Sequence, residues 1–205
     1  MSPVRIHTCS LTSVLSLGLL LWSCLGSPRH TLAQPRVVPQ LGVVLGLADT
    51  HNVPDDDDEQ TFNSPGALAQ LEYQRPLNPF WGFIGYTGVL WSWDETSDDL
   101  CGVTRSYRCE VSSRVALLGL RARGAIPFPW VAPFAEMGFG LSFGSLRTYS
   151  NEHHKRLNGI SGHIPFTLGL ALGPSHGFEL ALRVLFHPDA KQNTGVFALG
   201  MGFPI

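Results

Sequence analysis

Strict alternation of bulky apolar residues with small or polar ones is the feature that most limits what this chain can fold into. Between residues 131 and 143, for example, Phe139 and Leu141 alternate with Gly138 and Gly140. A period of two places alternate side chains on opposite faces of a β-strand. No segment after residue 34 repeats apolar residues at helical spacing. The sequence therefore predicts an all-β protein.

The same alternation recurs eight times. The expected strands cover residues 38–48, 66–76, 80–93, 111–123, 131–145, 163–173, 177–187 and 195–205. The links after the first, third and fifth strands are long, at 49–65, 94–110 and 146–162, whereas those after the second, fourth and sixth are short. An even number of strands joined by alternating long and short links is typical of an antiparallel up-and-down barrel, with both termini at one end.

The residues on the two faces indicate which face points outward. In a soluble barrel such as a lipocalin, the face that meets water would hold Gly138, Gly140, Gly169 and Gly200, although glycine weakens strands. In a membrane barrel the bulky residues face lipid, and small or polar residues line the lumen. Charged residues make up only 15% of the chain, against roughly 25% in soluble domains. We therefore expect an eight-stranded antiparallel transmembrane β-barrel whose side chains fill its interior.

Aromatic residues gather at both ends of the third expected strand. Trp81 and Phe83 stand at one end, and Trp91 and Trp93 at the other, all on one face. At ~3.3 Å per residue the two groups are ~40 Å apart along the strand, which a tilt near 45° reduces to ~28 Å across a membrane. Outer-membrane barrels carry aromatic girdles on both sides of an apolar band of ~25 Å. These residues are therefore predicted to form the two girdles.

Charged residues at the alternate positions that face the lumen are expected to form ion pairs, because an isolated charge in a narrow tube is unfavourable. The predicted cluster sets Glu72, Glu136 and Glu179 against Arg121 and Arg183. The same parity also holds Gln70, Gln74 and Arg123. The cluster would act as a salt-bridged plug that fixes strand register or, alternatively, as the gate of a narrow ion-conducting path.

Three segments resemble strands of the small outer-membrane β-barrel superfamily, the porin-like eight-stranded group related to the OmpA transmembrane domain and OmpX. They are PFAEMGFGLSF (133–143), GFELALRVLF (177–186) and GVFALGMGF (195–203). The resemblance implies a monomer in the outer membrane of the cell envelope, inserted by the barrel-insertion machinery, with lipid and lipopolysaccharide as partners. It implies a structural or surface-interaction role, no enzymatic activity and no cofactor. The final Phe203-Pro204-Ile205 departs from the aromatic terminus usual in this group.

The N-terminal segment is predicted to be a secretory signal peptide covering residues 1–33, followed by the barrel domain at 34–205. Arg5 precedes an apolar run from residue 11 to 25, which serines interrupt, and Thr31 and Ala33 supply the small residues read at a cleavage site. The alternative is a lipoprotein signal with Cys24 as the lipid-attachment residue.

Two features of the expected loops bear on cysteine and metal chemistry. Cys101 and Cys109 are the cysteines left after cleavage, and an exported pair so close in sequence is expected to form a disulfide.

Asp55, Asp56, Asp57 and Asp58 are weak candidates for binding a divalent cation, because the run lacks the spaced ligands of a calcium loop. Our expectation is therefore that no metal is bound.

Basic residues in or beside the loops can meet the phosphates of lipopolysaccharide, or can simply aid solubility. They are Arg105, Arg108, Arg114, Arg147, Lys155 and Arg156. The near-neutral formal charge of -2 gives no case for a nucleic-acid partner.

A lipid A-modifying enzyme is a further alternative, since some small outer-membrane barrels are enzymes. Such an enzyme needs a serine and a histidine near the outer surface, for which Ser161, His163, Ser112 and Ser113 are the candidates. They form no recognisable motif, and the sequence contains neither a P-loop nor a dinucleotide fingerprint.

Overall fold

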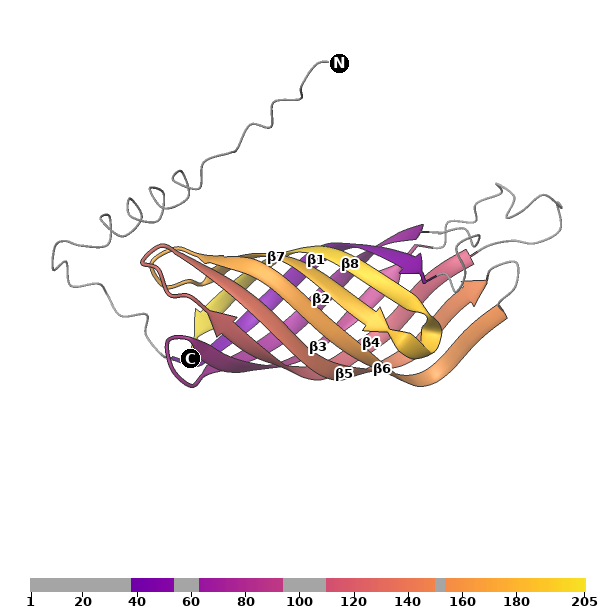
Figure 1. Cartoon of the computed structure of the whole chain (residues 1–205), viewed down its shortest axis with the longest axis horizontal. Helices are drawn as coiled ribbons and strands as arrows, with labels where there is room; N and C mark the ends of the chain where they lie inside the picture. Colours follow the sequence, from indigo (N-terminus) through magenta and orange to yellow (C-terminus); the bar gives the residue numbers. More distant parts are fainter. Residues whose placement is uncertain (1–37, 54–62, 94–109, 150–153) are drawn as a thin grey trace, which may run out of the picture. The chain divides into compact units, whose positions relative to one another are not determined.

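A computed structural model describes residues 38–53, 63–93, 110–149 and 154–205, which form a closed antiparallel barrel of eight strands (Figure 1). The strands are β1 (Gln40–Asn52), β2 (Asn63–Pro76), β3 (Trp81–Ser92), β4 (Glu110–Ala125), β5 (Val131–Tyr149), β6 (His154–Leu172), β7 (Phe178–His187) and β8 (Gln192–Pro204). Each strand pairs with its neighbours in sequence, and β8 closes the barrel by pairing with β1 from Gln40↔Pro204 to Asn52↔Gln192. The predicted fold class is confirmed.

The barrel has one end with short turns, and both terminal strands begin or end there. The turns 77–80, 126–130 and 173–177 join β2 to β3, β4 to β5 and β6 to β7 at this end. We call it the periplasmic end, since short turns lie there in bacterial outer-membrane barrels, and the opposite end extracellular. At the extracellular end a single 3-10 turn, η1 (Pro188–Ala190), joins β7 to β8.

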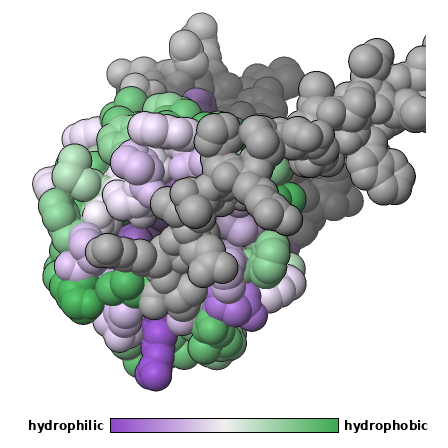
Figure 2. Space-filling model, turned by 90° about the vertical axis from the view of Figure 1, so that its left-hand side faces the viewer, coloured by the Kyte–Doolittle hydropathy of each residue, from purple (hydrophilic) through white to green (hydrophobic). Residues whose placement is uncertain are grey.

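Most bulky apolar side chains point away from the barrel axis, while a smaller cluster that includes Leu68, Leu90 and Leu117 is buried in the lumen. Phe139 is 69% exposed and Leu182 is 62% exposed, whereas Glu136 and Arg183 are buried in the lumen. Hydrophobic residues recur around the outer edge of the barrel when its periplasmic end faces the viewer (Figure 2). Because such a surface is unfavourable in water, this orientation fits a membrane barrel rather than a soluble one.

The residues predicted to form the aromatic girdles lie on the outer surface. Trp81 and Phe83 are exposed near the periplasmic end of β3, and Trp91 and Trp93 are exposed at its extracellular end. Across the four described ranges, no helix has both the length and the hydrophobicity needed to cross a bilayer.

The β5–β6 hairpin is longer than the sequence predicts. The expected link at 146–162 is largely strand, because β6 begins at His154 and pairs with β5 as far as Tyr149. Gly144 and Gly159 face each other across this hairpin and have φ angles of +150° and +123°. Glycine tolerates such angles, so this pair lets both strands continue beyond the point where other residues would be strained.

Candidate functional site in the barrel lumen

Arg123 joins two buried carboxylates near the periplasmic end of the lumen. Its Nη1 and Nη2 donate to Glu179 Oε1 and Oε2, at 2.6 and 2.8 Å. Its Nε also donates to Glu136 Oε1 at 2.6 Å. A guanidinium that meets one carboxylate with two parallel bonds gives a strong and geometrically specific contact. Three strands, β4, β5 and β7, are thereby held together across the lumen.

Arg121 and Arg183 share the third carboxylate. Arg121 Nη2 lies 2.5 Å from Glu72 Oε1, and Arg183 Nη1 lies 2.6 Å from the same oxygen. Arg121 Nη1 is also 3.1 Å from Glu136 Oε2. The two groups therefore form one network, since Glu136 contacts both Arg121 and Arg123.

This network, which we call the plug, contains three arginines and three glutamates and is neutral. Its members are Glu72, Arg121, Arg123, Glu136, Glu179 and Arg183, all of them buried. The structure brings together the five residues that the sequence assigned to a lumen cluster and adds Arg123. Arg123 lies two positions after Arg121, and alternate residues of a strand share a face. This spacing is the sequence signal that could have added Arg123 to the predicted cluster.

Neighbouring side chains fix the arginines of the plug. Gln70 Oε1 accepts from Arg183 at 2.5 Å, and Gln74 Oε1 accepts from Arg123 at 3.0 Å. The guanidinium of Arg121 lies over the ring of Tyr86 at 4.6 Å, and that of Arg123 lies over Phe134 at 3.9 Å. A cation over an aromatic face is stabilised, more so away from water.

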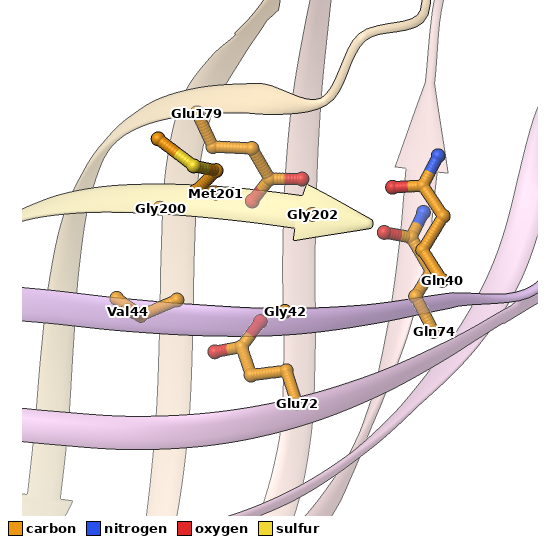
Figure 3. Close-up of a pocket in the computed structure, with 9 residues that line it drawn as sticks. All are labelled: Gln40, Gly42, Val44, Glu72, Gln74, Glu179, Gly200, Met201 and Gly202. Atoms are coloured by element: carbon orange, nitrogen blue, oxygen red, sulfur yellow. The ribbon is translucent and has the colours of Figure 1, made fainter. Parts of the chain in front are cut away.

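A small chamber lies on the periplasmic side of the plug (Figure 3). Its volume of about 10 Å³ is roughly the space of a single water molecule. The carboxylates of Glu72 and Glu179 and the amides of Gln40 and Gln74 surround it, while Gly42, Gly200 and Gly202 add no side chain (Figure 3). The chamber is too small to form an open channel.

A second polar group, the histidine cluster, closes the lumen closer to its extracellular end. Tyr86 Oη lies 2.6 Å from His163 Nε2, and Ser142 Oγ lies 2.8 Å from His163 Nδ1. The same Ser142 oxygen is 2.9 Å from His187 Nε2. The cluster takes one residue from each of β3, β5, β6 and β7, so it crosses the barrel from wall to wall.

Glycines make room for this cluster. A Cβ atom added at Gly140 would lie 2.5 Å from both Tyr86 Oη and His163 Nε2, closer than real Cβ atoms approach their neighbours. The sequence predicts small residues on the lumen face but not the cluster itself. Its four members come from four strands, and periodicity alone does not tell which of them meet across the lumen.

Polar contacts continue to the extracellular rim. Ser113 Oγ donates to Gln192 Oε1 at 2.9 Å, and Gln192 Nε2 donates to Thr148 Oγ1 at 2.8 Å. Thr50 and Thr194 are joined through their hydroxyls at 3.1 Å. Paired polar groups thus occupy the lumen at several levels, together with a buried apolar cluster that includes Leu68, Leu90 and Leu117.

Ser113, Ser161 and His163, three of the residues considered for a lipid-modifying enzyme, face the lumen, whereas Ser112 is on the opposite face of β4 and pairs in register with Arg147. Ser112, Ser113, Ser161 and His163 are all buried, and His163 is engaged by Tyr86 and Ser142. A lipid substrate outside the barrel has no access to groups in these positions. The arrangement therefore gives no support to that alternative.

Several predictions fall outside the described residues: the signal peptide at 1–33 with its alternative at Cys24, the disulfide between Cys101 and Cys109, the run Asp55–Asp58, and Arg105 and Arg108. They remain predictions, as does any role for the Lys155 side chain. Within the described ranges, no three histidine, cysteine or acidic residues are grouped so as to hold a metal ion.

Comparison with solved structures identifies the fold. Neisserial surface protein A has a TM-score of 0.54 with this chain at 10% identity, covering 80% of this chain and 97% of that one. The attachment invasion locus protein Ail of Yersinia pestis gives 0.48 at 16% identity, covering 82% and 99%. The N-terminal β-barrel domain of Pseudomonas aeruginosa OprF gives 0.45 at 10% identity, covering 80% and 97%. No protein-family model and no curated protein sequence matches the chain.

The likeness to Neisserial surface protein A and the closed strand order agree. The chain has the fold of the eight-stranded outer-membrane β-barrels. This fold, with the exposed apolar belt that surrounds it, is that of a barrel that spans a membrane.

Proposed function

We propose that the protein is a non-conducting barrel of the outer membrane that binds lipopolysaccharide at its extracellular rim and presents this rim to surface partners. The plug is the observation that carries the proposal. Its charges cancel and its members are buried, so the lumen offers neither a wide path nor a surplus charge to attract an ion. The histidine cluster adds a second closure in series.

The outward face of the extracellular rim supports the lipopolysaccharide contact. Arg147 of β5 and Arg156 of β6 are direct cross-strand partners. Two neighbouring guanidinium groups offer several N–H donors that match the oxygens of a phosphate. Nearer the membrane, the same hairpin exposes Phe143 and Ile160, which are cross-strand partners as well. Cations directly above an apolar wall match the phosphates and acyl chains of lipopolysaccharide.

Arg114 adds a third outward cation at the same end. It is exposed on β4, pairs in register with Trp91, and lies 6.0 Å from the centre of that ring. Because Trp91 belongs to the extracellular girdle, Arg114 stands at the level of the lipid headgroups.

Thermal unfolding in vesicles tests the lipopolysaccharide contact. Folded protein is reconstituted in vesicles with or without lipopolysaccharide, and protection from heat unfolding is compared. We expect lipopolysaccharide to stabilise the wild type and to stabilise Arg147→Gln/Arg156→Gln clearly less. Ala135→Leu, which changes the outer surface of β5 away from both arginines, is the control and should behave as the wild type does. Equal stabilisation of the double variant would reject the contact.

Planar-bilayer recording separates the proposal from the ion-channel alternative. A plugged barrel should give no stepwise conductance after insertion, which is verified by heat-modifiable gel migration of the same preparation. Regular conductance steps from the wild type would instead favour the channel.

A further inference from the structure

A groove of about 610 Å³ opens on the outer wall of the barrel, over β2, β3 and β4. Its centre is Gly85, whose register partners are Tyr73 on β2 and Leu120 on β4. A Cβ added at Gly85 would meet only Leu120 Cδ2, at 3.7 Å. The missing side chain therefore leaves open space on the surface rather than room for a packed neighbour. Leu71, Thr87 and Leu118 complete the largely apolar walls.

One cation stands beside this groove. Arg75 lies two residues from Tyr73 towards the periplasmic end of β2, is exposed, and pairs in register with Phe83 of the girdle. Within residues 38–53, 63–93, 110–149 and 154–205, it is the only charged side chain on the outer surface at that end. None of these residues gives it an ion pair or a hydrogen bond.

We propose that Arg75 and the groove at Gly85 form a binding site for an anionic phospholipid. The guanidinium of Arg75 binds the phosphate, since paired N–H donors match its oxygens. An acyl chain lies in the groove over Gly85. Phe83, the partner of Arg75, is two residues from Gly85, or ~7 Å along the strand. The headgroup site and the start of the chain site are therefore adjacent.

The positive charge of Arg75 favours an anionic lipid, rather than a second copy of the chain, as the occupant of the groove. A second copy would have to bring an acidic side chain to Arg75 at the periplasmic level, and the described outer surface carries none there. An anionic headgroup supplies this charge at the girdle level, where lipid phosphates lie. The site is at the opposite end of the barrel from the proposed lipopolysaccharide contact and does not depend on it.

Native mass spectrometry of the folded protein tests this site, with equal amounts of phosphatidylglycerol and phosphatidylethanolamine as probes. The wild type is expected to retain phosphatidylglycerol preferentially. Arg75→Gln should lower this preference about fivefold, the effect of one basic residue near a lipid surface. Gly85→Leu, which fills the groove, should reduce retention of both lipids. Ala135→Leu, on the outer surface away from the site, is the matched control and should match the wild type.

Three results would overturn the site. They are an unchanged lipid preference in Arg75→Gln, unchanged lipid retention in Gly85→Leu, and a wild-type dimer that Gly85→Leu dissociates without loss of lipid. The last result would assign the groove to a second copy. Heat-modifiable migration verifies that every variant is folded, and both site residues are on the surface, where substitution leaves the lumen intact.

Discussion

Arg123 is the residue on which the periplasmic half of the plug depends, because it contacts two of the three buried carboxylates. Arg123→Met leaves Glu179 without its arginine and Glu136 with only Arg121. Removing one partner of a buried ion pair costs about 3–5 kcal/mol. We expect a loss of unfolding free energy of that size, measured by urea unfolding in vesicles.

The control for this variant is Arg156→Met, at an exposed arginine, for which we expect a change within about 0.5 kcal/mol. Arg123→Met/Glu179→Leu should be less unstable than Arg123→Met alone, since no lone carboxylate is left at residue 179. Equal unfolding midpoints for Arg123→Met and Arg156→Met would contradict the role given to Arg123.

Gly140 tests the packing of the histidine cluster. Gly140→Ala places a methyl group against Tyr86 and His163, and overpacking of this kind costs about 1–3 kcal/mol. Gly162→Ala is the matched control on β6, because a Cβ there would have no neighbour within 4 Å. Urea unfolding should show a loss for Gly140→Ala only. Adding Tyr86→Phe, which removes the hydroxyl, should recover part of it.

At the scale of whole strands, the alternation predicts all eight elements and the face that each presents to lipid. It fails at the β5–β6 hairpin, where residues 146–149 and 154–162 are strand although 146–162 is the expected link. Residues 154–158 contain little apolar alternation. Above the membrane a strand has no lipid to face, so its sequence carries no such pattern. It is held instead by its ladder to β5, which a single-strand pattern does not report.

The sequence also predicts only part of the candidate site. Parity places the plug residues in the lumen, and charge alone suggests that they pair. Which arginine meets which glutamate depends on the shift between neighbouring strands, and the sequence does not fix that shift. The partners of Arg123 and the histidine cluster required the three-dimensional arrangement.

The position of an outward residue along its strand sets the cost of placing a charge there. Phe139 lies in the middle of the exposed face of β5, and Phe203 lies at the periplasmic end of β8. An arginine at the bilayer midplane costs about 2–4 kcal/mol, falling to about 0–1 near the interface. Phe139→Arg should therefore lower the unfolding free energy by more than Phe203→Arg does. The measurement is urea unfolding in vesicles, and equal losses would contradict the predicted membrane position.

For the molecule as a whole, the lumen is closed by two groups in series rather than by one gate. The plug lies towards the periplasmic end, and the histidine cluster lies between it and the extracellular rim. Tyr86 links them, since its ring lies against Arg121 and its hydroxyl contacts His163. Opening one layer leaves the other in place, so the closed state should withstand single substitutions.

This arrangement makes a specific prediction for conductance. Arg121→Ala/Arg183→Ala opens space in the plug and leaves Glu72 without a cation, yet the histidine cluster still blocks the lumen, so no conductance steps are expected. Adding Tyr86→Ala removes the link between the layers and frees a path past His163. The triple variant should then give small steps selective for cations, because the remaining lumen charge is negative. Steps already present in the double variant would show that the plug is the only barrier.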